Sequence, residues 1–342
     1  MSCVHDLIVS SSRLAKGDAA VAIGVNMHLI VVANLVRRRS MAVAAGDQRR
    51  SEAFEHSLRD IVSKDVVIAA AISEAGQDLT RPLTVAERIA SGWRIDGHKI
   101  FCTMSPAASV LYASVRYVEQ HGRERYGYAE IPIDAPGVTV NNDWDALGMR
   151  ASGSHSVCLN GVELPASAVR GGFAAGDSSA FMERNLANGL FHASASLGIA
   201  EKSQATATHA LRARAVAAAD ARSRTLVAEN EIELAAIRAS LARAATLIDE
   251  HRARNPTTEG SHEEIAALFT EAQAAKAFVS ETAVGIVDRA LAMSGGAGYL
   301  NGHALARAYR DVRAGSFMHP LGANRAYELV TQTALGLQPV LH

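Results

Sequence analysis

Residues 93–103 read Trp-Arg-Ile-Asp-Gly-His-Lys-Ile-Phe-Cys-Thr, and this stretch decides which fold the sequence predicts. Apolar and polar residues alternate along it, which is typical of half-buried β-strands. The Asp96-Gly97 pair at its centre is the strongest short-range signal for a β-hairpin, and Asn160-Gly161 gives the same signal within residues 156–164. We therefore expect a hairpin to turn at each of these two pairs.

Further strands are predicted outward from this stretch. The continuous apolar run at residues 66–72 indicates a buried strand, and residues 110–118 and 126–133 indicate two more. Short strands with turn signals between them predict a β-barrel-like domain at residues 66–170.

Helical patterns flank the strands on both sides. Residues 12–38 and 52–62 favour helix, and the chain becomes helical again after residues 170–177. Two apolar stripes at helical spacing are Leu234, Ile237, Leu241, Ala244 and Ile248, and Ile265, Leu268, Ala272, Ala275 and Val279. A turn at residues 255–260 joins them, as in an antiparallel bundle. The expected fold class is multidomain α+β: an N-terminal α-helical segment at 1–65, the central β-barrel-like domain, and a C-terminal α-helical bundle at 171–342.

Composition narrows the function classes. The 342 residues carry a formal net charge of −1, which indicates neither nucleic acid nor a membrane as a partner. The three cysteines, Cys3, Cys102 and Cys158, are odd in number and widely separated, so we expect neither a disulfide framework nor a metal site. The beginning of the chain does not resemble a signal peptide, and the apolar stretch at 21–36 is too short to span a bilayer. We expect a cytoplasmic protein in which this stretch is a buried helix.

Five motifs carry a family resemblance. They are Ile-Ser-Glu-Ala-Gly-Gln-Asp at 72–78, Gly-His-Lys-Ile-Phe-Cys-Thr at 97–103, Leu-Gly-Met-Arg-Ala-Ser-Gly-Ser at 147–154, Ser-Gly-Gly-Ala-Gly-Tyr at 294–299 and Arg-Ala-Tyr-Arg-Asp at 307–311. In their order and spacing they resemble signatures of the acyl-CoA dehydrogenase superfamily, over roughly residues 12–335. The resemblance implies a flavin-dependent oxidoreductase that uses FAD, with FMN as a possible alternative. It also implies a short N-terminal domain, because Met1 corresponds to a point inside the family's first helical domain.

The resemblance also implies cofactor-binding residues. Ile72 and Ser73 would bind the pyrimidine edge of the flavin, while Phe101, Cys102 and Thr103 at a strand end would supply an aromatic wall and a hydroxyl. Gly295 and Gly296 would approach the cofactor of a neighbouring subunit, which implies a homodimer or homotetramer, or a heteromer with a longer homologue. The structural alternatives are that Phe101 is a core residue, Thr103 an ordinary strand hydroxyl, and the glycine pair a helix C-cap.

The family's catalytic carboxylate is missing from both of its usual positions. Dehydrogenation of an acyl-CoA requires a base that removes the α-proton. Most relatives carry a glutamate nine residues after the Arg that corresponds to Arg310, and this chain has His319 there. A minority carry it on the first bundle helix, where this chain has Asn188. Glu183 could replace it only after a register shift, and His319 is the candidate catalytic residue.

Three functions remain open at this stage. The first is a flavin-dependent oxidoreductase that oxidises an acyl-thioester-like substrate. The second is a two-component monooxygenase of the same fold, which receives reduced flavin from a separate reductase and uses His319 near its small-molecule substrate. The third is a non-catalytic partner subunit of a heteromeric acyl-CoA dehydrogenase.

Overall fold

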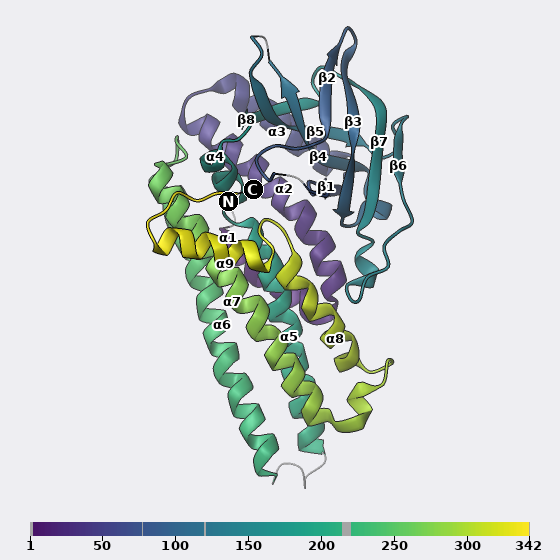
Figure 1. Ribbon diagram of the computed structural model, residues 1–342, viewed down its shortest axis with the longest axis vertical. Coiled ribbons are helices and arrows are strands. Elements are labelled where there is room, and N and C mark those ends of the chain that lie inside the picture. The colour runs from purple at the N-terminus through teal and green to yellow at the C-terminus, as the bar shows by residue number, and fades with distance from the viewer. Residues whose placement is uncertain (1–2, 77, 120, 214–219, 342) are drawn as a thin grey trace.

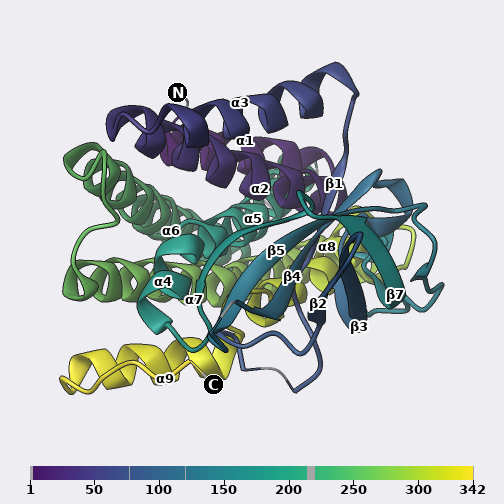
Figure 2. The same cartoon turned by 90° about the horizontal axis from the view of Figure 1, so that it is seen from above.

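The computed structural model describes residues 3–76, 78–119, 121–213 and 220–341. A twisted β-sheet lies at one end of a bundle of long helices, with the N-terminal helices beside both (Figure 1). Figure 2 shows the same junction from above, with the strands on one side and the helices on the other. The predicted α+β fold, with helices before and after a β region, is confirmed.

Three helices precede the sheet: α1 (Val4–Gly17), α2 (Ala19–Ala44) and α3 (Gln48–Ser63). A single helix was expected from residue 12 to residue 38, but the chain breaks at Asp18. This residue is extended, with φ −150°, and its carboxylate accepts hydrogen bonds from the N–H groups of Ala20 (2.9 Å) and Val21 (3.1 Å). An N-cap of this kind starts a new helix because it satisfies amides that have no partner within the helix.

Helix α2 is a core helix. Its length of 26 residues and its apolar composition would allow it to cross a membrane, so the expectation that the segment is too short was wrong. However, 56% of its most apolar window is buried inside the protein. Asn26 Nδ2 donates to the carbonyl of Phe191 at 2.8 Å, which satisfies a polar group in the contact with the bundle. The predicted burial of this helix is confirmed.

The described residues of the β region form eight strands: β1 (Ile68–Ala71), β2 (Val85–Ile89), β3 (Gly92–Cys102), β4 (Val110–Val118), β5 (Glu124–Pro132), β6 (Val138–Val140), β7 (His155–Pro165) and β8 (Val169–Ala174). Seven of them follow the order β6-β7-β3-β2-β4-β5-β8, and β1 pairs in parallel with β4. A separate apolar cluster, which includes Ile95, Leu111 and Ile131, forms the core of this region.

The two predicted hairpin turns were wrong. β3 runs straight through Asp96-Gly97, β7 runs straight through Asn160-Gly161, and the two strands pair with each other. Where they meet, Asp96 lies opposite two residues of β7, since Ile95 pairs with Val162 and Gly97 with Leu159. Gly161 has φ +60°, and its N–H donates to the Asp96 carboxylate at 2.7 Å. An extra residue with a left-handed glycine is a β-bulge, so these turn-forming residues bend the sheet instead.

A hairpin with a two-residue loop connects β2 and β3. Ile89 pairs with Gly92, which leaves Ala90 and Ser91 as the loop. Gly92 has φ +147°, and a Cβ there would lie 2.2 Å from the carbonyl oxygen of Leu164. Only glycine fits this position, because any side chain would collide with the backbone of the neighbouring strand.

The bundle comprises α4 (Ser178–Asn185), α5 (Asn188–Ala213), α6 (Ala221–Arg254), α7 (His262–Ser294), α8 (Ala304–Val312) and α9 (Ala323–Ala334). Both apolar stripes face the core, with Leu268 only partly buried. The predicted turn between them is confirmed, since α6 ends at Arg254 and Ser261 forms a capping box with Glu264 before α7. Helix α5 lies at the centre, and every residue from Gly189 to Ala200 is buried.

A buried ion pair fastens the loop after β1 to the sheet. Lys99 is 0% exposed, and its Nζ donates to Glu74 Oε1 and to Ser114 Oγ, each at 2.9 Å. The Glu74 carboxylate also accepts the N–H groups of Leu83 (2.6 Å) and Thr84 (2.7 Å). Burial alone would raise the pKa of Glu74, but the charge of Lys99 and these hydrogen bonds hold the pKa below its ordinary value. The carboxylate therefore stays ionised inside the protein.

Replacing Lys99 by Met should lower the free energy of unfolding by roughly 3–5 kcal/mol, because it leaves the Glu74 carboxylate buried without its counter-ion. Urea denaturation measures the loss. Lys64→Met is the matched control, since Lys64 pairs with Asp60 at 3.0 Å while 66% exposed, and it should cost less than about 1 kcal/mol. Equal losses in the two variants would contradict the structural role of the buried pair.

Candidate functional site

A cavity of about 440 Å³ lies where the sheet, helix α2 and the bundle meet. Its walls come from segments far apart in the sequence: one face of α2, the ends of β1 and β3, the connection at 144–154, the α4–α5 junction and residues 310–319. Its volume lies in the range of small-molecule sites.

Most of the sequence-predicted site residues meet in this cavity. Ile72, Ser73, Phe101, Thr103 and His319 all line it. A backbone hydrogen bond joins the loop of Ile72 and Ser73 to the strand that carries Phe101, because the N–H of Ile100 donates to the carbonyl of Ser73 at 2.9 Å.

The strand end at Phe101 places alternate side chains on opposite sides. Phe101 is 59% exposed, has φ +54°, and meets Trp144 edge-on with ring centroids 6.1 Å apart. Cys102 points into the sheet core and does not line the cavity, and burial raises the pKa of its thiol to about 12. Thr103 returns to the cavity, where its hydroxyl bonds Ser154 Oγ at 2.9 Å. The cavity wall thus combines aromatic surface with hydroxyl groups.

Gly295 and Gly296 lie away from the cavity, in the turn that follows α7. Gly295 has φ +67°, and its N–H donates to the carbonyl of Ala292, so within one chain the pair serves as a helix C-cap. Both glycines are exposed, and a Cβ at either would have nothing within 4 Å. Their expected contact with a neighbouring subunit stays a prediction.

The hydrogen bonds around His319 fix its tautomer. Asn185 Nδ2 donates to the carbonyl of Phe181 at 2.8 Å, so its Oδ1 is the acceptor, and Oδ1 also accepts from Asn188 Nδ2 at 2.8 Å. His319 Nε2 lies 3.1 Å from the same Oδ1 and must therefore carry the proton. This leaves His319 Nδ1 as an acceptor.

The cavity histidines are held neutral. Burial and then the charge of Lys276 lower the pKa of His319 to about 3, and burial also lowers the pKa of His192 well below its ordinary value. Lys276 is itself a support for the segment that carries His319, since its ammonium contacts the carbonyls of Met318, of His319 at 3.5 Å and of Leu321 at 2.6 Å.

No carboxylate lines the cavity within the described ranges, whereas three arginines, Arg184, Arg310 and Arg313, do. Asn188 and His319, the positions where the resemblance implies the family's base, both line the cavity and hold neutral groups. Glu183 is buried behind the cavity, paired with Arg38 and 3.7 Å from Arg184. Because Glu183 is ion-paired with these arginines and does not line the cavity, it does not replace the missing base.

Sequence reasoning missed several cavity residues, notably Tyr112, Tyr128, Trp144 and Arg184. Tyr112 and Tyr128 stack with ring centroids 4.9 Å apart on the face of β4 and β5 that meets the bundle. The alternation within residues 110–118 could have placed Tyr112 on one face of its strand. It could not have shown which face the bundle covers.

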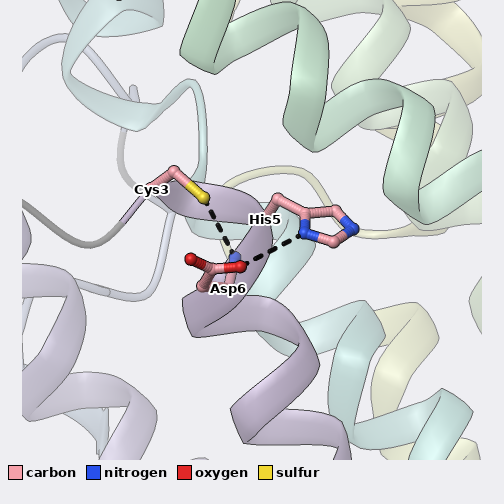
Figure 3. Close-up of side chains that lie close together, drawn as sticks. All are labelled: Cys3, His5 and Asp6. Carbon is pink, nitrogen blue, oxygen red and sulfur yellow. Dashed lines mark hydrogen bonds and ion pairs between the residues drawn. The ribbon is translucent and has the colours of Figure 1, made fainter.

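Cys3, His5 and Asp6 bring their side-chain ligand atoms within 4.8 Å of one another at the start of α1 (Figure 3). The cluster is explained by helix capping. Cys3 Sγ accepts the N–H of Asp6 at 3.4 Å, and Asp249 accepts the N–H groups of Val4 (2.8 Å) and His5 (3.1 Å). A helix N-terminus repels cations, so we assign these residues a structural role.

Comparison with known families agrees with this geometry. The model of the acyl-CoA dehydrogenase middle domain matches residues 68–162, and that of the acyl-CoA dehydrogenase C-terminal domain matches residues 180–324. The chain belongs to the acyl-CoA dehydrogenase family. It is a flavoprotein oxidoreductase of that family, which confirms the resemblance carried by the five motifs.

Several relatives have names other than dehydrogenase. The chain is 32% identical to the amino sugar nitrososynthase DnmZ of Streptomyces peucetius, over 97% of this chain and 80% of the relative. It is 30% identical to the L-evernosamine nitrososynthase of a Micromonospora strain, over 98% and 77%. A solved structure of KijD3 in complex with FMN and dTDP-3-amino-2,3,6-trideoxy-4-keto-3-methyl-D-glucose superposes with a TM-score of 0.88 at 28% identity, covering 100% of this chain and 82% of that one.

Lowering the pH from about 6.5 to about 3 should progressively destabilise this acyl-CoA dehydrogenase family member. The unfolded chain protonates His192 and His319 in this window, whereas the folded protein keeps them neutral, so the unfolded state binds more protons. Each histidine adds up to about 1.4 kcal/mol per pH unit to the slope. The variant with His192→Gln and His319→Gln should show a shallower slope in urea titrations than His262→Gln, an exposed control. Identical slopes would contradict the neutral state of the cavity histidines.

Proposed function

We propose that the protein is a reduced-flavin-dependent monooxygenase that uses FMN and oxygenates the nitrogen of an amino sugar. The observation that carries this proposal is the lack of any carboxylate among the described residues of the cavity wall. Removal of an α-proton from an acyl thioester needs such a base, and oxygenation of an amine does not. The nitrososynthase names of the relatives support the same reaction class.

The cavity fits a flavin ring. An isoalloxazine needs an apolar wall and a few polar contacts at its edge. Phe101 and Trp144 offer aromatic surface, and Thr103, Ser154 and the Ser73 loop offer hydroxyl and backbone groups. When reduced and bound there, the flavin supplies the chemistry that activates dioxygen.

FMN is the cofactor that we infer. FMN is present in the KijD3 complex whose fold this chain shares. The sequence offers no clean counterpart of the Arg-x-x-Phe-Gly segment that many relatives place on the pyrophosphate of FAD. Gly295 and Gly296, the other expected pyrophosphate contact, could reach a cavity only in a neighbouring subunit.

His319 would orient the substrate. Its Nδ1 is an acceptor that can bind an N–H of the substrate amine, while Nε2 is held by Asn185. With its pKa lowered to about 3, the imidazole is too weak a base to retain a proton near neutral pH. It therefore acts as a neutral hydrogen-bond acceptor.

We also infer a homodimer or larger assembly. The turn after α7 exposes Gly295, Gly296, Tyr299 (81% exposed) and Leu300 (66% exposed). Apolar side chains gathered at an exposed turn favour contact with a second subunit.

Phe101→Ala and Thr103→Ala should each weaken FMN binding by about three- to tenfold, because they remove stacking surface and a hydroxyl contact. Fluorescence titration with oxidised FMN measures the affinity. Phe278→Ala, an exposed phenylalanine on α7 at 46%, is the control and should bind FMN as the wild type does. Unchanged affinity in both cavity variants would place the flavin elsewhere.

Supplied with FMN, a flavin reductase, NADH and oxygen, the protein should add oxygen to the amine of a dTDP-linked amino sugar. Mass spectrometry of the product follows the reaction. His319→Ala should lower kcat at least about tenfold because it removes the acceptor that orients the amine. His262→Ala should not. A parallel mixture with acyl-CoA thioesters and an artificial electron acceptor tests dehydrogenation, and turnover only in that mixture would overturn the proposal.

A further inference from the structure

The cavity is elongated along helix α2. One face of this helix lines it through Ile23, Met27, Ile30, Val31 and Asn34. The span from residue 23 to residue 34 corresponds to about 16 Å at the rise of an α-helix. A flavin ring at one end therefore leaves room for a second group at the other.

The two ends have different neighbours. At the first end, Gly24 of α2 faces Met104, the residue that directly follows Thr103. A Cβ at Gly24 would lie 3.2 Å from the sulfur of Met104. At the second end, Tyr112 packs against the cluster that contains Val31 and Leu35. Thr103 and Tyr112 thus approach different parts of helix α2, the first near Gly24 and the second near Val31.

Arg184 supplies a charge near Tyr112 and Tyr128 that the protein neutralises only in part. Its one carboxylate contact is Glu183 at 3.7 Å, and Glu183 is itself paired with Arg38. Within the described ranges the guanidinium takes part in no hydrogen bond to the protein, although its side chain is only 17% exposed. A mostly buried guanidinium that donates no hydrogen bond to the protein is a binding group for phosphate or carboxylate.

Neutral donors surround this guanidinium. Tyr112 and Tyr128 stack beside it, and Asn34 and Asn188 line the same space. Burial raises the pKa of both phenols, so they stay protonated and can donate to an anion. Two phenols beside one arginine, on a cavity wall that has no carboxylate among the described residues, form a site for an oxyanion.

We propose that Arg184, Tyr112 and Tyr128 form a subsite for a phosphate-bearing group of the substrate, at the end of the cavity beside Val31 and away from Phe101 and Thr103. The inference rests on the proposed function, since it assigns the amine to the flavin end and the phosphate to this one. A nucleoside diphosphate linked to an amino sugar has both groups, separated by the sugar. Arg184 is a binding and specificity residue here and takes no part in oxygen transfer.

Calorimetric titration of the FMN-loaded protein with dTDP, and separately with inorganic pyrophosphate, tests the subsite. Arg184→Met should weaken dTDP binding ~10- to 100-fold, Tyr112→Phe should weaken it ~3- to 10-fold, and Arg184→Lys should recover part of the loss. Arg243→Met, on an arginine that is 66% exposed and paired with Glu271, is the control and should bind dTDP as the wild type does. With the amino sugar nucleotide as substrate, Arg184→Met should raise KM and change kcat less than about threefold.

The outcomes separate the subsite from the reaction. Unchanged dTDP affinity in Arg184→Met and Tyr112→Phe overturns the subsite, even where the wild type oxygenates the amine. A parallel loss of FMN affinity in Arg184→Met also overturns it, because the residue would then act through the flavin or the fold. Arg184-dependent binding of dTDP without any oxygenated amine supports the subsite and contradicts the proposed reaction. Equal affinity for pyrophosphate and dTDP would show that the diphosphate alone is recognised, which supports it.

Discussion

The buried pair between Lys99 and Glu74 is the interaction on which the rest of the site depends. Glu74 directly follows Ser73, and Lys99 precedes Phe101 by two residues, so both of these cavity walls start from one pair of buried charges. Ser114 closes the network, since its hydroxyl accepts from Lys99 and donates to the carbonyl of Ile72 at 3.1 Å. Neither segment can move without leaving a charge unpaired in the core, and a site with fixed geometry follows from that cost.

The motifs predicted which segments meet at the cavity better than they predicted the local fold around it. The segments at 72–78 and 97–103 were expected to meet at a flavin site, and the structure brings Ser73 within a hydrogen bond of Ile100. The Asp96-Gly97 and Asn160-Gly161 pairs misled because a left-handed glycine serves a tight turn and a β-bulge equally well. Only the pairing of β3 with β7, a contact distant in sequence, decides between these two structures.

The missed residues share a physical cause. Tyr112, Tyr128 and Arg184 line the cavity because their side chains converge on one space from β4, β5 and α4, which no local pattern encodes. His319 could be found because a family spacing pointed to it, but its tautomer depends on Asn185, 134 positions away in the chain. Cys102 shows the converse, since it belongs to the same motif as Phe101 and Thr103 and yet faces the opposite side of the strand.

The balance of charge in the cavity connects these observations to chemistry. A family member that removes an α-proton needs an anionic base near the flavin, and such a base would repel a phosphate that entered the same space. Here the two base positions are Asn188 and a neutral His319, while Arg184, Arg310 and Arg313 leave the wall with positive charge only. The neutral residues Asn188 and His319, which stand where the family has its base, thus also make the cavity more favourable for an anionic substrate. In such a cavity a bound anion would supply negative charge that the cavity wall lacks, so it would stabilise the three arginines that line this wall.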